Sequence, residues 1–166
     1  RIPIFCDTTS CTHTLLFETG GDILTPENRE KYKQLKIMDI TQWLKEVVLP
    51  RIKVIRPKNR ILLHPTCSCQ IMGLTPVLLD IARKCAREVI LPDNWGCCGA
   101  SGDRGFIFPE LSDSATRDER DEIGHESFDG CYSLARTCEI AMQDHIEQPY
   151  ESIVYLVDET IQDQGT

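Results

Sequence analysis

Two adjacent cysteines, Cys97 and Cys98, lie in a glycine-rich stretch over residues 94–105. Neighbouring cysteines do not readily bond each other, because their side chains diverge and the closed ring is strained. Both can reach one metal ion or cluster where the backbone turns sharply, and glycine permits such a turn. If the stretch then opens a helix, the helix N-terminus favours negative charge and lowers the thiol pKa values. The alternative is a strand-to-helix turn that holds inert buried cysteines.

Two further cysteines, Cys67 and Cys138, are expected at the same topological place as the doublet. Each lies at or near the end of a predicted strand and at or before the start of a predicted helix. In open parallel sheets the carboxyl ends of the strands share one edge, and ligands bind there. Four thiolates suit either Zn²⁺ or an iron–sulfur cluster. The chain has no Cys-x-x-Cys hook of the kind that structural zinc sites use, which favours the cluster.

The remaining cysteines divide into candidate ligands and core residues. Cys69 and Cys131 lie near the predicted site, and each is either a ligand or a packed thiol. Cys85 is expected on the apolar face of a helix and Cys6 at a strand end, so core packing explains both. His64 is either a donor to a cluster sulfur or a satisfied structural group at a strand end.

Composition limits the classes of function. The net charge of −8 over 166 residues argues against a nucleic-acid surface. A basic segment between residues 51 and 60 is interpreted as a solvated turn. Nine cysteines form an odd count in a chain too long to need disulfides, so we expect reduced thiols and a cytoplasmic protein. No stretch approaches the length of a membrane span.

The order of apolar runs and helical patterns predicts an α/β fold with a largely parallel sheet flanked by helices. Asp39, with Gln42 three residues later, predicts a capping box at the start of an amphipathic helix. A faint internal repeat relates Cys11 and Cys138, since each is followed by an apolar strand and an amphipathic helix. Strands are expected at 2–6, 36–38, 60–64 and 89–91, a strand or strand–helix junction at 152–155, and polar surface helices at 26–35 and 113–123.

Four segments together resemble a known family: residues 64–68, 97–106, 109–111 and 133–139. They are similar to the cysteine-rich CCG domain of the heterodisulfide reductases, and most of all to the C-terminal end of FAD-linked D-2-hydroxyacid dehydrogenases with iron–sulfur domains. The resemblance implies that residues 1–50 are the tail of a first CCG module, 51–59 a connector and 60–166 a second module. The chain, which begins with Arg1, is then expected to be a fragment.

The resemblance also implies a ligand set. The family motif ends in Cys-x-x-Cys, but here Ala135 stands where the first of these cysteines is expected, and Thr8 does so in the first repeat. The five-thiolate set of a non-cubane cluster is therefore incomplete. What remains suits an ordinary [4Fe–4S] cluster, with Cys69 or Cys131 as substitutes and Cys11 assigned to the upstream module. The four implied ligands are Cys67, Cys97, Cys98 and Cys138.

The function implied by the resemblance is electron transfer. An upstream flavin domain, carrying FAD, is expected to oxidise D-lactate or D-2-hydroxyglutarate, and electrons leave through iron–sulfur centres towards a quinone or cytochrome. The expected partners are the flavin and ferredoxin-type domains of the same protein, located in the cytoplasm or peripheral to the inner membrane. The fragment is not expected to turn over substrate alone, and its cluster can be lost on isolation. The alternatives are a zinc-binding or metal-free docking domain, and catalytic thiol chemistry.

Overall fold

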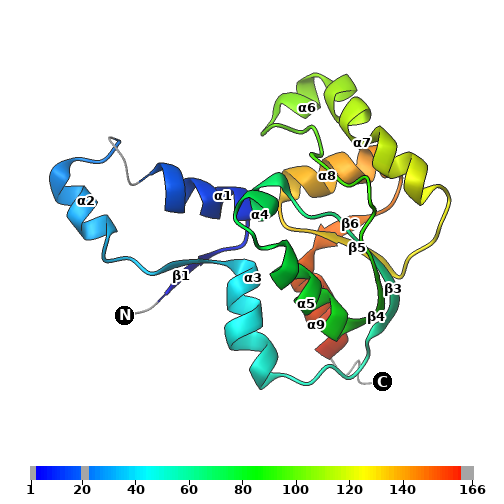
Figure 1. Ribbon diagram of the computed structural model, residues 1–166, viewed down its shortest axis with the longest axis horizontal. Helices are drawn as coiled ribbons and strands as arrows, with labels where there is room; N and C mark the ends of the chain where they lie inside the picture. The colour runs from blue at the N-terminus through cyan, green and yellow to red at the C-terminus, as the bar shows by residue number, and fades with distance from the viewer. Residues whose placement is uncertain (1–2, 20–22, 162–166) are drawn as a thin grey trace.

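The computed structural model describes residues 3–19 and 23–161 and has an α/β architecture (Figure 1). Its strands form two parallel sheets, one with four strands in the order β4-β3-β5-β6 and one with the pair β1-β2. The predicted fold class is confirmed. Of the predicted elements, Ile2 of the first strand and the glycines of the loop before Pro26 lie outside the described residues.

The larger sheet forms from residue 58 onward. Its strands are β3 (Lys58–Leu63), β4 (Ala86–Ile90), β5 (Gly130–Ser133) and β6 (Tyr150–Ser152). The helices of this part are α4 (Cys67–Ile71), α5 (Thr75–Cys85), α6 (Arg104–Ile107), α7 (Pro109–Ile123), α8 (Arg136–Ile146) and α9 (Ile153–Ile161).

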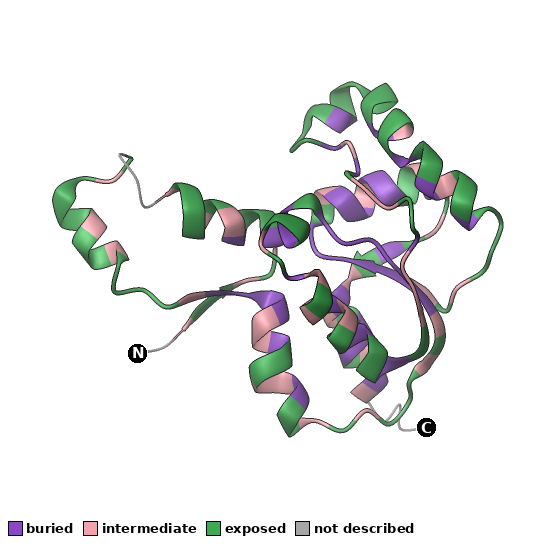
Figure 2. Cartoon of the chain, viewed as in Figure 1, coloured by how far each residue is buried: buried purple, intermediate pink, exposed green. Residues whose placement is uncertain are grey.

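Strand β3 is the centre of the core, and both of its faces are covered. Ile61, Leu62 and Leu63 are fully buried. Because side chains alternate across a strand, Ile61 and Leu63 join one hydrophobic cluster and Leu62 joins the other. The first cluster is completed by apolar residues of α3, α5 and α9, and the second by residues of α7 and α8. Figure 2 shows the buried strands between these helices. Such a doubly covered parallel sheet explains the continuous apolar sequence of β3.

The connections leave β3 and β5 in opposite directions. From β3 the chain passes through α4 and α5 to β4 on one side, and from β5 it passes through α8 to β6 on the other side. The neighbours β3 and β5 therefore flank the place where the strand order reverses. In open parallel sheets the crevice at the carboxyl ends of two such strands is the usual ligand site.

The N-terminal part builds the smaller sheet from β1 (Ile4–Cys6) and β2 (Ile37–Asp39). Between these strands lie α1 (Thr9–His13), which continues as a π-helical turn, and the polar surface helix α2 (Pro26–Tyr32). Helix α3 (Ile40–Trp43) continues through a π-helical and a 3₁₀ turn to Arg51, so Pro50 lies within the final turn. The predicted capping box at Asp39 and Gln42 is present.

The unit β1-α1-β2-α3 corresponds in register to β5-α8-β6-α9. Cys6 pairs with Asp39 in the first unit, and Ser133 pairs with Ser152 in the second. Two residues separate the first strand from the helix in both units, and the third helical residue is a cysteine in both. The residue that ends the second strand also accepts a backbone hydrogen bond from the next helix, at 2.9 Å in the first unit and 3.4 Å in the second.

The buried cap at Asp39 gives a stability prediction. Asp39→Ala removes the acceptor for the N–H of Thr41, and loss of an N-cap of this kind costs about 1 kcal/mol, with an upper end of about 2 kcal/mol. Urea unfolding should show this decrease, whereas Asp39→Asn, which keeps a side-chain oxygen, should lose less. Equal losses in the two variants would contradict a capping role.

Candidate functional site

The four cysteines predicted as ligands line one cavity of about 250 Å³. Cys67 comes from the segment after β3, Cys138 from the helix after β5, and the doublet from the loop after β4. The cavity thus lies at the carboxyl ends of β3 and β5, where the strand order reverses. The other lining residues are Ser10, Thr66, Ser68, Ala100, Ser101, Gly102, Ala135 and Thr137.

The four sulfur atoms form a series of contacts rather than a cage. The Cys98 thiol donates to Cys138 Sγ over 3.0 Å. Cys97 makes hydrogen-bonding contacts with the side chains of both Cys67 and Cys98, and its Sγ accepts the N–H of Gly99 at 3.4 Å. Cys67 and Cys97 are exposed, whereas Cys98 and Cys138 are buried. The series therefore leads from solvent to the base of the cavity.

Two of these cysteines lie in the first turns of helices. Thr66 caps α4 by accepting the N–H of Cys69 at 3.2 Å, and this places Cys67 at the first position of that helix. Cys138 is the third residue of α8, so it lies in the first turn of the helix that was predicted to begin near it.

The loop that carries Cys97 and Cys98 is held by α7. Gly99 has a φ of +73°, and a Cβ at this position would lie 2.6 Å from the carbonyl oxygen of Leu111. At Gly105 an added Cβ would lie 2.6 Å from Ser112 Oγ. Upstream of the doublet, the Glu122 carboxylate accepts the N–H groups of Asp93 and Asn94 at 2.7 and 2.8 Å. The glycines therefore allow the loop to lie directly against α7.

The expected lowering of the thiol pKa values at the doublet is wrong. The hydrogen bond to Cys138 raises the pKa of Cys98 to about 12, and burial acts in the same direction. The pKa of Cys97 is raised as well, first by its hydrogen bond with Cys98 and then by burial. The next helix, α6, begins only at Arg104 and has four residues, so the doublet does not sit at a helix N-terminus. Neighbouring thiols and burial instead raise the pKa values of both cysteines.

The cavity offers four thiols, a donor type that both zinc sites and iron–sulfur clusters use. Within the described ranges, no group of three or more His, Cys, Asp or Glu side chains is arranged to hold one ion. A structural zinc site needs four ligands around one centre, whereas a cluster takes one thiolate at each of several irons. The charged-ligand candidates of the cavity are cysteines alone, which is the donor type of iron–sulfur clusters.

The other candidate cysteines lie outside the lining of this cavity. Cys69 is fully buried in the cluster beneath α5, and burial raises its pKa to about 12. Cys131 is buried on the opposite face of the sheet, and burial raises its pKa to about 12 too. Cys11 is exposed on α1 beside Ser10, which does line the cavity. Their role as ligands stays a prediction.

A buried hydrogen-bonding partner of His64 was missed by sequence analysis. His64 Nδ1 lies 2.9 Å from Glu119 Oε2, and both side chains are almost completely buried. The other ring nitrogen, Nε2, has no hydrogen-bond partner. Glu119 lies on the face of α7 that also buries Ser112, Thr116 and Ile123, at helical spacing. The sequence predicts this segment as a surface helix. The helical spacing of these residues nevertheless indicates that the Glu119 side chain faces inward.

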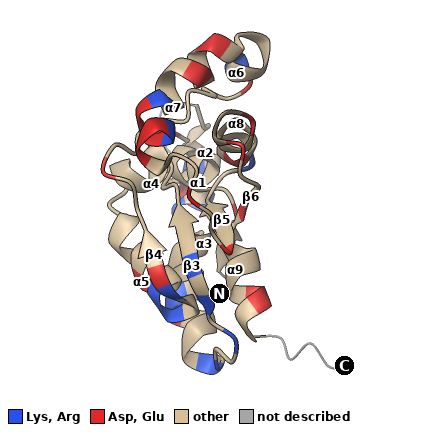
Figure 3. Ribbon diagram, turned by 90° about the vertical axis from the view of Figure 1, so that its right-hand side faces the viewer, with Lys and Arg blue, Asp and Glu red and all other residues tan. Residues whose placement is uncertain are grey.

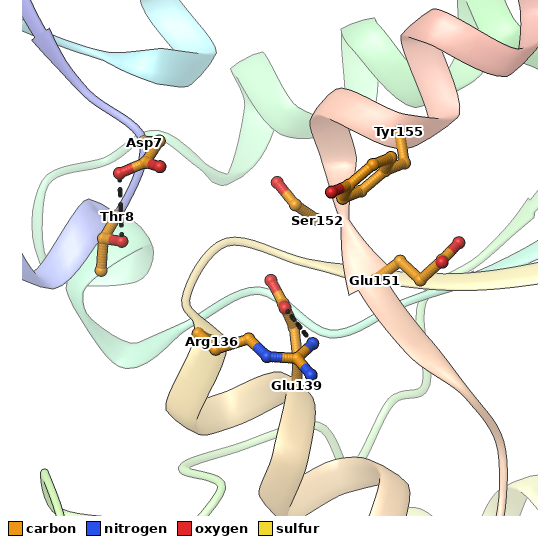
Figure 4. Close-up of a pocket in the computed structure, with 7 residues that line it drawn as sticks. All are labelled: Asp7, Thr8, Arg136, Glu139, Glu151, Ser152 and Tyr155. Atoms are coloured by element: carbon orange, nitrogen blue, oxygen red, sulfur yellow. Dashed lines mark hydrogen bonds and ion pairs between the residues drawn. The ribbon is translucent and has the colours of Figure 1, made fainter.

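A second pocket, of about 350 Å³, lies between the two corresponding units (Figure 4). Asp7 and Thr8 from the first unit face Arg136, Ser152 and Tyr155 from the second. Arg136 Nη1 contacts the largely buried Glu139 carboxylate at 3.1 Å, while burial raises the pKa of Glu139. Acidic, basic and hydroxyl groups are mixed here, so the lining selects no single ligand charge.

Comparison with protein-family models gave no match, and no curated protein matches the chain. Among the described residues, no helix has the length and apolar character needed to cross a membrane.

The Glu122 contacts predict a pH dependence. Its two backbone hydrogen bonds lower the pKa of Glu122 below the ordinary 4.5, so the stabilisation is present above pH 4.5 and is lost as the pH falls through the lowered value. Glu122→Gln should therefore unfold at lower urea concentration than wild type near pH 7 and approach wild type at acid pH.

The matched control for this prediction is Asp118→Asn on the exposed face of the same helix. It should change stability little across the same pH series. If the loss of stability in Glu122→Gln is the same at neutral and at acid pH, the charge of the carboxylate is not what holds residues 93–94 in place.

Proposed function

We propose that this chain is an iron–sulfur module that carries electrons. The observation that supports the proposal most is that four cysteines from three separate segments line one cavity at the carboxyl edge of the sheet. The expected positions of these cysteines at strand ends predict the set, and the family resemblance implies it as well. Cys67, Cys97, Cys98 and Cys138 are the proposed ligands of a [4Fe–4S] cluster.

A bound cluster would supply one-electron transfer, and the chain's residues do the rest. The cysteines anchor it as thiolates, so binding releases their protons and overcomes the raised pKa values of Cys97 and Cys98. Cys98 and Cys138 must also move apart from their 3.0 Å contact to serve different irons. The backbone N–H of Gly99 donates to the Cys97 sulfur, and hydrogen bonds of this kind tune the cluster's reduction potential.

The exposed side of the cavity is the proposed route for electrons. Cys67 and Cys97 reach solvent, and the adjoining α6 segment exposes Phe106, Ile107 and Phe108. Apolar surface of this kind is typical of protein contacts. We assign the upstream contact to flavin and ferredoxin-type domains of the same protein, where FAD oxidises a D-2-hydroxy acid such as D-lactate or D-2-hydroxyglutarate. The acceptor is a quinone or cytochrome, and the protein works in the cytoplasm or peripheral to the inner membrane.

The rival function is a structural domain in which the cysteines bind zinc or no metal. No three of the four donors surround one point, so zinc binding, like cluster binding, requires the sulfurs to rearrange. The two proposals are separated by colour and by sulfide content, because a zinc protein is colourless and contains no inorganic sulfide.

Anaerobic reconstitution with iron and sulfide tests the proposal. Wild type should take up about four irons and four sulfides per chain and develop visible thiolate-to-iron absorption. Cys98→Ser should lower cluster retention at least about tenfold, since even changes to groups that support ligands cost about 10–100-fold in metal affinity.

The control for reconstitution is Cys11→Ser, because Cys11 is an exposed cysteine outside the cavity lining. It should load as wild type does. A colourless wild-type protein that holds one zinc, or a Cys98→Ser protein that loads fully, would overturn the assignment.

A further inference from the structure

The sulfur atoms of Cys98 and Cys138 lie in direct contact at the base of the cavity. Their Sγ atoms are 3.0 Å apart, about 1 Å more than the 2.03–2.05 Å of a disulfide. The two residues come from different elements, the doublet loop and the first turn of α8, so their bridge would avoid the strained ring of adjacent cysteines. Both thiols line a cavity that small molecules can enter.

We propose that Cys98 and Cys138 form a reversible oxidation site that closes into a disulfide when no cluster is bound. The oxidant is a peroxide or a small disulfide that reaches the cavity. The bridge would join the doublet loop to α8 at the base of the cavity, below the exposed Cys67 and Cys97.

The step balances with hydrogen peroxide as oxidant. One sulfur attacks a peroxide oxygen, the O–O bond breaks, and a sulfenic acid and one water form. The second sulfur then attacks the sulfenic sulfur, the S–O bond breaks, and hydroxide leaves as water with the remaining thiol proton. Two thiols lose two electrons and two protons, and one peroxide becomes two waters. A dithiol reductant reverses the change by thiol–disulfide exchange and is itself oxidised.

The alternative pairs are less favoured by their positions. Cys97 contacts its neighbour Cys98, but a disulfide between adjacent cysteines closes a strained ring. Cys67 and Cys97 do contact each other, but both are exposed, so nothing in the cavity shields either from capping by small thiols. Cys98 and Cys138 are buried beside each other, which favours closure of the bridge over capping.

The consequence for the cluster rests on the proposed function. A Cys98–Cys138 disulfide removes two of the four proposed ligands, and a bound cluster in turn keeps the two sulfurs apart. Oxidation of the cluster-free chain and cluster assembly are therefore mutually exclusive. Under oxidising conditions the disulfide would prevent the cluster-free chain from binding a cluster. Reduction of the disulfide would restore its ability to bind one.

Peptide mapping of the full chain tests the disulfide directly. The reduced, cluster-free protein is treated with one equivalent of hydrogen peroxide, alkylated and digested with trypsin without reduction. Trypsin separates residues 88–104, which contain the doublet, from residues 137–166, which contain Cys138. We expect these two peptides to be linked in wild type and in Cys97→Ser, which leaves Cys98 as the partner. The link should be absent in Cys98→Ser.

Three results would overturn the proposal: a residue 137–166 peptide that is recovered alkylated, one linked to residues 61–83 through Cys67 or Cys69, or a link that survives in Cys98→Ser through Cys97. Circular dichroism confirms that each variant is folded, and Cys97→Ser, at an exposed position, keeps the test available if Cys98→Ser does not fold.

Iron uptake separates this proposal from the proposed function. Oxidised wild type should bind several-fold less iron and sulfide than reduced wild type, and a dithiol should restore uptake. If the chain is not a cluster module, neither form loads although the peptides are linked. If the pair does not oxidise, the peptides are unlinked and peroxide treatment leaves loading unchanged.

Discussion

The parallel pairing of β3 with β5 is the constraint on which the rest of the site depends. Leu62 pairs with Cys131 and Leu63 with Tyr132, and the ladder continues past the strands where the N–H of His64 donates to the carbonyl of Tyr132. A hydrogen bond from Ser133 Oγ to the His64 carbonyl then ties the two carboxyl ends together at 2.8 Å. Cys67 and Cys138 follow directly from these ends. Burial of β3 on both faces supplies the hydrophobic stabilisation for this arrangement.

Helix α7 contacts both the sheet and the loop of the cysteine doublet, and so it holds the doublet in place relative to the sheet. Its outer face is charged, as the acidic and basic residues along it show (Figure 3). Its inner face reaches the sheet through the contact of Glu119 with His64. The exposed Glu122 holds the start of the loop, and the first turns of the helix lie against the glycines after the doublet. One amphipathic helix therefore sets the distance of Cys97 and Cys98 from the other two cysteines.

Much of this could be predicted because it depends on local sequence or on general topology. The Asp39 capping box is local, and the meeting of Cys67, Cys98 and Cys138 follows from the rule that carboxyl ends of parallel strands share an edge. The sign of the pKa shift at Cys98 could not be predicted, because it depends on a 3.0 Å contact with a residue 40 positions away. Glu119 was missed because its helix is polar overall and only its spacing marks the inner face.

Ser10 has a consequence for how the two units of the chain depend on each other. It belongs to α1 of the first unit, yet it forms part of the wall of the cysteine cavity, and the N–H of the neighbouring Thr9 donates to the Leu134 carbonyl of the second unit at 3.2 Å. Anything held in the cavity therefore contacts both units and stabilises their association by mass action. Binding in the cavity and the docking of the N-terminal unit are thermodynamically linked, so residues 58–161 without that unit would present a cavity with one side removed.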